Sequence, residues 1–244
     1  MSRIFEALEL NGIEFEDTPE RGPAISVVHA QPFAKTPKPF AEKILTLHQR
    51  IEATLGNRTG KIVSIAALEP GDQGFTYSFE LARFAATHLA RRVLLLGTWQ
   101  SGCSTRVLQN GVARGWEAAT FQNAPISEYV HQLDEPPIAV SQLNVTRDAL
   151  AALASSTRFG NALRRMRKQY DLIVVDTPPI SEGMDAVLLS PVVDGTVLIV
   201  NAGESRWQVV RNAVEQLTAQ NGTVVGVVLN KRRYFIPSFI YRKL

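Results

Sequence analysis

Short apolar runs recur between residues 61 and 230, and more polar stretches separate them. The runs lie at residues 61–68, 92–97, 171–176, 195–201 and 224–230. The run at 171–176 has almost no polar interruption, which is typical of a strand covered on both faces of a parallel sheet. We therefore expect each of these runs to form a buried strand.

The stretches between the runs carry apolar residues at helical spacing. Ile44, Leu47, Ile51 and Leu55 form one such stripe, and Gly56 ends it. Helices are expected over residues 40–55, 76–90, 147–169 (as one helix or two), 183–190 and 205–220. Strands that alternate with helices predict an α/β protein of three α/β/α layers around a mostly parallel sheet.

The ends of the chain differ in composition from its middle. Residues 1–40 contain repeated prolines and predict an extended arm, whereas residues 41–233 hold the predicted strands and helices. Residues 234–244 form a basic, aromatic tail. Within the domain, residues 98–146 are less regular, with short elements expected around Val107, Tyr129 and 138–143.

Composition excludes several classes of protein. The 244 residues suffice for one large α/β domain with an extension. No apolar run approaches the ~20 residues needed to cross a bilayer, and we expect no secretory signal. Cys103 is the single cysteine, which excludes an internal disulfide and fits a cytoplasmic location. The net charge of +3 argues against a nucleic-acid partner, and the four scattered histidines argue against a metal site.

The loop after the first strand occupies the place of a phosphate-binding loop. Such loops have the form G-x-x-x-x-G-K-[ST], in which lysine supplies positive charge and the hydroxyl binds magnesium. Here Gly71 and Gly74 allow a tight turn and Thr76 offers a hydroxyl, but there is no lysine and Asp72 adds a negative charge. The alternative is an ordinary strand-to-helix turn in which Thr76 caps the helix.

The third strand ends in an aspartate. Asp176 follows four apolar residues and precedes Thr177-Pro178-Pro179. An aspartate at such a strand end commonly holds magnesium through water. The alternative is a strand-terminal cap or a turn-forming residue before the prolines.

Longer strings resemble a known family. QYDLIVVDTPP (169–179), DAVLLSPVVDGTVLIVNAGESR (185–206) and VVGVVLNKRR (224–233) are similar to the cytoplasmic domain of bacterial tyrosine kinases (BY-kinases) and their relatives in exopolysaccharide assembly. These proteins belong to the MinD/ParA branch of P-loop proteins. The resemblance implies a P-loop NTPase-like fold and a site for ATP and magnesium, with Asn230 facing the nucleotide base.

The chain departs from this family at the positions that carry its chemistry. The family's loop lysine aligns with Gly74 or, after a shift of one residue, with Phe75. The family also has a second acidic motif with two aspartates. This chain has Gly97 and Trp99 at those two positions. The family's subunit-contact arginines align with Leu45 and His48, which puts its ring assembly in doubt.

The resemblance and its departures together favour a catalytically inactive BY-kinase-like protein. Its nucleotide site would be vestigial, formed by Gly71, Gly74, Thr76, Asp176 and Asn230, with no catalytic residue, no bound metal and no cofactor required. It would be a cytoplasmic partner or regulator of an inner-membrane polysaccharide chain-length or export protein.

Two other functions stay open. An active ATPase or tyrosine autokinase would need a cation from elsewhere, such as Lys61, Arg106 or a neighbouring subunit, together with ATP and magnesium. Tyr234 and Tyr241 would then be candidate phosphorylation sites. A MinD/ParA-like positioning protein would use the basic aromatic tail to reach the inner-membrane surface.

Overall fold

The computed structural model describes residues 38–98 except 57, 59 and 72, residues 115–117 and 120, and residues 126–231. The predicted arm, apart from its last residues, and the predicted tail lie outside these residues. The predicted element at Val107 lies outside them as well. The helix expected over 40–55 begins at Lys38, inside the predicted arm.

The core of the molecule is a seven-stranded sheet with the order β3-β4-β2-β5-β1-β6-β7. Neighbouring strands run parallel except for β3 and β4. The strands are β1 (Lys61–Ala67), β2 (Val93–Gly97), β3 (His131–Gln132), β4 (Ala139–Gln142), β5 (Leu172–Thr177), β6 (Gly195–Asn201) and β7 (Val224–Asn230). Every apolar run of the sequence forms a strand, so the predicted mostly parallel sheet is confirmed.

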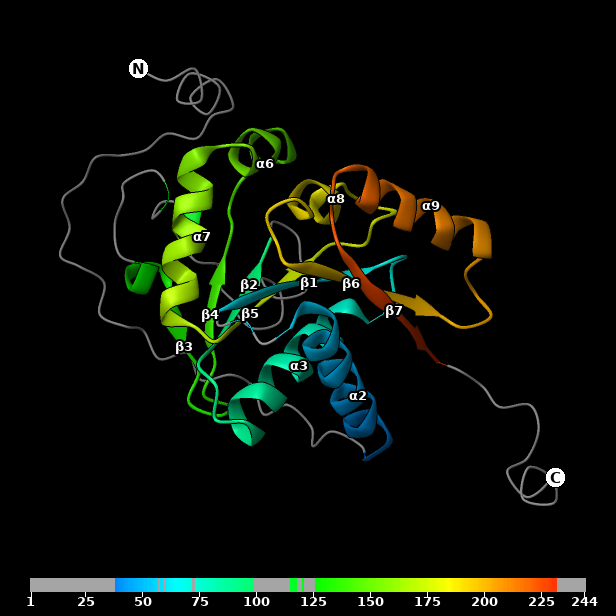
Figure 1. Cartoon of the computed structure of the whole chain (residues 1–244), viewed down its shortest axis with the longest axis horizontal. Coiled ribbons are helices and arrows are strands. Elements are labelled where there is room, and N and C mark those ends of the chain that lie inside the picture. The colour runs from blue at the N-terminus through cyan, green and yellow to red at the C-terminus, as the bar shows by residue number, and fades with distance from the viewer. Residues whose placement is uncertain are drawn as a thin grey trace.

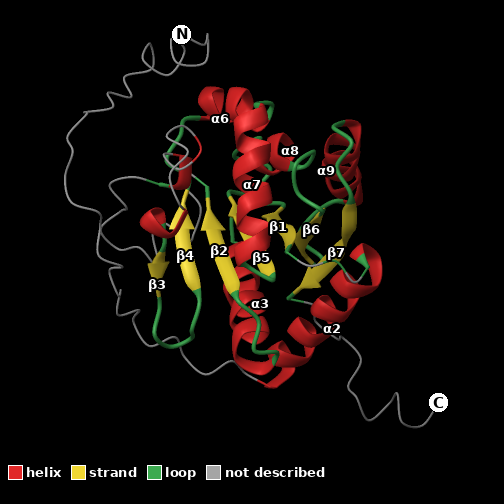
Figure 2. Ribbon diagram, turned by 60° about the vertical axis from the view of Figure 1, so that its left-hand side comes forward, coloured by secondary structure: helices red, strands yellow, loops and turns green. Residues whose placement is uncertain are grey.

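Helices cover both faces of this sheet (Figures 1 and 2). The helices are α2 (Lys38–Leu55), α3 (Gly74–His88), α6 (Arg147–Ala154), α7 (Thr157–Gln169), α8 (Asp185–Leu189) and α9 (Trp207–Ala219), with a 3-10 turn η1 at Ile126–Tyr129. Helices α2 and α3 pack on one face of the sheet, and α6 to α9 pack on the other. The predicted three-layer architecture is therefore confirmed.

The segment 147–169 forms two helices because two side chains cap separate N-termini. Thr146 Oγ1 accepts a hydrogen bond from the backbone N–H of Ala149 and begins α6. Ser156 Oγ accepts one from the N–H of Phe159 and begins α7. The new cap at Ser156 starts a second helix directly after the first one ends.

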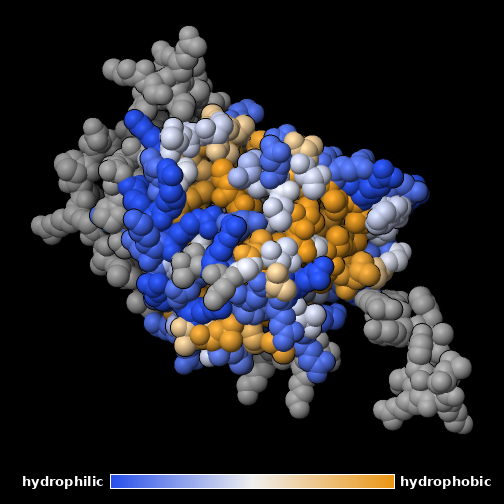
Figure 3. Space-filling view, viewed as in Figure 1, coloured by the Kyte–Doolittle hydropathy of each residue, from blue (hydrophilic) through white to orange (hydrophobic). Residues whose placement is uncertain are grey.

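Strand β7 forms the outer edge of the sheet in the described part of the chain. Val227 and Leu229 are 41% and 53% exposed on this edge. Figure 3 shows an apolar band in the same region of the molecule. This surface contrasts with β5, every residue of which is buried.

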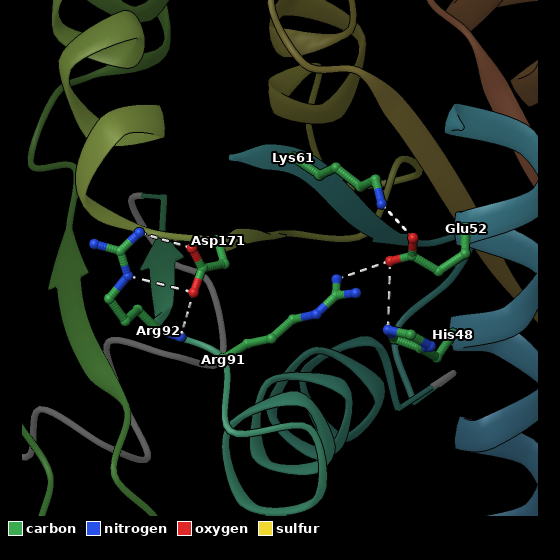
Figure 4. Close-up of polar contacts among 6 residues, drawn as sticks. All are labelled: His48, Glu52, Lys61, Arg91, Arg92 and Asp171. Atoms are coloured by element: carbon green, nitrogen blue, oxygen red, sulfur yellow. Dashed lines mark hydrogen bonds and ion pairs between the residues drawn. The ribbon is translucent and has the colours of Figure 1, made fainter. Parts of the chain in front are cut away.

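A charged cluster at the amino end of β1 joins α2 to the sheet (Figure 4). Lys61, only 1% exposed, forms an ion pair with Glu52 of α2. Arg91, which follows α3, donates to the other oxygen of Glu52 at 2.8 Å. His48 Nε2 lies 3.5 Å from that same oxygen, and its ring lies 5.7 Å from the ring of Phe84 at an angle of 57°. One carboxylate thus holds three groups from different parts of the chain.

The pKa values in this cluster follow from burial and charge. Burial alone raises the pKa of Glu52, but the hydrogen bonds from Lys61 and Arg91 outweigh it and hold that pKa below its usual value. Burial lowers the pKa of His48, and the charges of Arg91 and Lys61 lower it further against the opposing effect of Glu52. Both groups therefore favour the folded state less as the pH falls.

Replacing Glu52 with glutamine should destabilise the fold by about 3 kcal/mol, because it leaves the buried ammonium of Lys61 without a counter-charge. Urea unfolding at neutral pH measures this loss. Glu215→Gln is the matched control, since its ion pair with Arg211 is exposed on α9. That control should cost less than about 1 kcal/mol. Equal losses in the two variants would contradict the role of Glu52.

Acidification should lower the free energy of unfolding, beginning near pH 6.5, the ordinary pKa of histidine. Below that pH the unfolded chain binds a proton that folded His48 resists binding. A second decrease should begin near 4.5, the ordinary pKa of Glu52. Urea unfolding at a series of pH values measures both decreases. His48→Gln should remove the first decrease, with the exposed His88→Gln variant as control; a decrease that persists in His48→Gln would contradict the assignment.

Candidate site at the carboxyl end of the sheet

Asp176 lies at the centre of the sheet's carboxyl edge. In the strand register it stands between Ile65 of β1 and Gly97 of β2. Its backbone carbonyl accepts a hydrogen bond of 3.1 Å from the N–H of Thr98. Gly97, which aligns with the first aspartate of the family's second acidic motif, therefore lies directly beside Asp176. Trp99 lies outside the described residues.

The side chain of Asp176 is held by a serine of α3. Ser78 Oγ donates to Asp176 Oδ1 at 2.8 Å, and both residues are buried. Sequence analysis missed Ser78 because it considered only the hydroxyl beside the loop glycine. Its spacing was a usable signal, since Ser78 follows Gly74 by four residues and so lies on the same face of the helix.

The loop between β1 and α3 ends in an unusual helix start. Gln73 is the N-cap and has a left-handed backbone, with φ of 64° and no side-chain capping hydrogen bond. Gly71 also has positive φ, 89°, as expected for a tight turn. The helix begins at Gly74, so the alternative in which Thr76 caps it is wrong. Thr76 lies inside the first turn because Gln73 already reverses the backbone direction.

Neither position that aligns with the family's lysine presents a polar group. A Cβ added to Gly74 would lie 3.1 Å from the Cβ of Ala67, so the start of α3 packs tightly on the end of β1. Phe75 is buried in the core between the sheet and helices α2 and α3, where its ring lies 5.9 Å from that of Phe79. Phe75 therefore serves packing.

Asn230 is enclosed by hydrogen bonds at the end of β7. Its Oδ1 accepts from Tyr77 Oη at 3.2 Å, and its Nδ2 lies 3.2 Å from Gln73 Oε1 and 3.3 Å from Asn201 Oδ1. The side-chain amide is thus engaged by α3, by the loop before it and by β6. Sequence analysis did not single out Tyr77, Gln73 or Asn201, although Gln73 lies in the loop and Asn201 in the string 185–206 that resembles the family.

Tyr77 connects this group to the core. It is fully buried and its ring lies 4.9 Å from the ring of Phe40 on α2. Burial raises the pKa of its hydroxyl to about 12, so the group stays protonated and donates to Asn230 near neutral pH. Helix α2, helix α3 and strand β7 therefore meet at one tyrosine.

The structure brings the five predicted site residues to one edge of the sheet. Gly71, Gly74 and Thr76 lie on the loop and first turn after β1, Asp176 is the second-last residue of β5, and Asn230 is the last residue of β7. Whether these residues bind a ligand stays a prediction.

The proposed replacement cation Lys61 is at the wrong end of the sheet. It begins β1, so the length of that strand, ~20 Å, separates it from the loop. Its ammonium is already paired with Glu52. Arg106, the other intramolecular candidate, lies outside the described residues. In the described residues, no three histidine, cysteine or acidic side chains gather as metal ligands do.

Comparison with curated proteins finds relatives of one kind. The chain is 25% identical over 183 residues to the tyrosine-protein kinase CpsD of Streptococcus agalactiae, covering 75% of this chain and 80% of the relative. It is 25% identical over 196 residues to the tyrosine-protein kinase YwqD of Bacillus subtilis, covering 79% and 81%. A shorter match of 79 residues to the putative tyrosine-protein kinase CapB of Staphylococcus aureus reaches 37% identity, over 32% of this chain and 35% of the relative. No protein-family profile matches the chain.

Solved structures share the fold. The kinase domain of the Escherichia coli tyrosine kinase ETK has a TM-score of 0.72 at 18% identity, covering 93% of this chain and 89% of that one. The kinase domain of VpsO has a TM-score of 0.60 at 26% identity, covering 80% and 99%. None of the helices in the described residues is long and apolar enough to span a membrane. The chain is a homologue of bacterial tyrosine-protein kinases and has the P-loop NTPase-like fold of their kinase domains.

Proposed function

We propose that this chain is a catalytically inactive BY-kinase-like protein that acts in exopolysaccharide or capsule biosynthesis. The observation that carries the proposal is which side chains surround Asp176 at the carboxyl edge of the sheet. Asp176 has Gly97 as its neighbour on β2, and its side chain is engaged by the neutral hydroxyl of Ser78. Asp176 remains at this edge, but the loop lysine and the two further aspartates with which the family acts on a phosphoryl group are absent.

The described residues fit ATP with magnesium poorly. Residues 68–76 include no lysine or arginine to balance phosphate charge. The amide of Asn230, expected to face the base, is already satisfied by Tyr77, Gln73 and Asn201. Nucleotide entry would have to break these contacts before gaining its own.

The size of the expected loss in reaction rate favours inactivity over weakened activity. Phosphoryl transfer depends almost entirely on positioning and on stabilising charge. Removing one strong electrostatic contributor costs about 3–4 kcal/mol, or roughly 100–1000-fold in rate. The lysine and two aspartates are absent together. Although the losses of rate are not additive, Asp176 alone does not compensate for the three missing charges.

In this proposal the protein works by contact. It would bind the cytoplasmic side of an inner-membrane polysaccharide chain-length or export protein and regulate it without chemistry. The support is the intact kinase-like frame, together with relatives that are named as tyrosine-protein kinases.

An active tyrosine kinase is the second candidate, and the names of the relatives favour it. It requires a cation near the loop that Lys61 does not provide. Within the described residues, Lys231 is a basic side chain that follows the site, directly after Asn230, and it lies 3.7 Å from Glu204. An active enzyme would therefore draw its cation from there, from Arg106 or from a second subunit.

Nucleotide titration by calorimetry, with and without magnesium, separates these functions. The native chain should show no micromolar ATP binding, because the loop has no cation. Gly74→Lys should increase ATP affinity at least about tenfold, which is about 1.4 kcal/mol. Thr87→Lys is the matched control, since it puts the same charge on the exposed last turn of α3, far from the loop, and should leave ATP affinity unchanged.

A second variant is needed because a lysine at position 74 would crowd the side chain of Ala67. If Gly74→Lys does not fold, Gly74→Lys with Ala67→Gly removes the methyl group 3.1 Å from the new Cβ. Micromolar ATP binding by the native chain, with hydrolysis that Asp176→Asn abolishes, would overturn the proposal of inactivity and establish the second candidate.

The tail is proposed to contact the inner-membrane surface. Residues 231–244 mix cations with aromatic and aliphatic side chains, a combination that suits anionic lipid. The full chain should co-sediment with vesicles that contain anionic phospholipid, and a chain of residues 1–230 should stay in solution. Equal sedimentation of the two chains would rule out a tail anchor, and with it the MinD/ParA-like alternative.

A further inference from the structure

The outer edge of β7 has none of the usual protections of an edge strand. Exposed edge strands commonly carry charged residues or proline, because open N–H and C=O groups recruit other strands. Residues 224–230 contain neither. A shift in the pairing with β6 falls at the beginning of β7, and its later residues keep a regular register. Within the described residues, β7 pairs with β6 alone.

The two faces of this edge differ. Val227 and Leu229 pair with Leu198 and Val200 of β6, whose side chains pack with α8 and α9. Gly226 and Val228 lie on the opposite face, above α2. A groove of about 820 Å³ runs along that face between β7 and α2. A Cβ added to Gly226 would meet no atom within 4 Å, so the groove has room for a side chain there.

We propose that β7 pairs antiparallel with β7 of a second copy of this chain, about a twofold axis through Val227. The two sheets then form one continuous sheet. In this register Gly226 lies opposite Val228 of the second copy, and that valine occupies the space beside the glycine. Twofold symmetry repeats the same contact on the other side of the axis.

Charges on α2 favour a second copy over an unrelated strand. Leu55, at the end of α2, lies beside Gly195 and Val225 near the beginning of β7, so α2 runs antiparallel to β7. Glu42 and Arg50 line the groove. They are spaced by multiples of four, which puts them on one line along the helix. Lys43 lies on the neighbouring line, with the buried Leu47.

The twofold axis is perpendicular to the sheet and keeps both α2 helices on one face, antiparallel to each other. Glu42 then approaches Arg50 of the second copy, and Arg50 approaches Glu42 of the second copy. A partner of unrelated sequence would have to supply both charges and both apolar contacts in the same order. The surface of this chain supplies them to itself.

Sedimentation velocity of the full chain over a wide concentration range tests the interface. We expect a monomer–dimer equilibrium. Leu229→Lys should weaken dimerisation at least about tenfold, because it puts two like charges at a desolvated edge. Leu89→Lys is the matched control, an equal change at a residue 39% exposed after α3. A chain that is monomeric throughout, or a dimer that Leu229→Lys leaves unchanged, overturns the proposal.

A charge-reversal cycle identifies the partner. Glu42→Arg and Arg50→Glu should each weaken the dimer, and the double variant should restore it, which a loss of folding would not do. Failure of the double variant to restore dimerisation overturns the assigned register. In a Cys103→Ser background, Val227→Cys should form a cross-linked dimer on oxidation and Leu89→Cys should not. Equal cross-linking of the two would place the contact elsewhere.

Discussion

Burial of β5 on both faces is the constraint on which the rest of the structure depends. A strand without polar side chains along its length is stable only in the middle of a covered sheet. It therefore lies between β1 and β2, and its first polar side chain, Asp176, emerges at the carboxyl edge. The loop after β1 must pass beside that aspartate. The location of the candidate site follows from this packing, whatever chemistry the site retains.

Contacts within the protein occupy this edge where a nucleotide-binding relative would be expected to contact its ligand. Ser78 engages Asp176, and three polar side chains enclose Asn230. Buried polar groups need hydrogen-bond partners, so an edge that no longer met a ligand would be stabilised by such internal contacts. They also link α3 to the ends of β5 and β7. The proposal of a contact-based function is consistent with an edge organised in this way.

The sequence predicted the sheet and the helices well because their apolar periodicity is strong. The strands at 195–201 and 224–230 were predicted to the residue. The start of α3 was placed two residues late, because the left-handed backbone of Gln73 leaves no mark in its side-chain type. The partners of Asn230 were missed for another reason: Tyr77 and Asn201 come together only through tertiary packing. Lys61 was considered as a replacement cation although the predicted strand over 61–68 already separates it from the loop by the length of the strand.

The cluster around Glu52 has a consequence for how such a chain can change. It lies at the amino end of β1, a strand's length of ~20 Å from the loop. Substitutions separated by more than about 10 Å usually contribute independently to stability. Apart from Tyr77, which packs on Phe40 of α2, residues at the carboxyl edge can therefore be exchanged one after another while the Glu52 cluster keeps its full strength. A fold organised in this way tolerates drift in its chemistry, because this cluster and most residues of the candidate site are energetically separate.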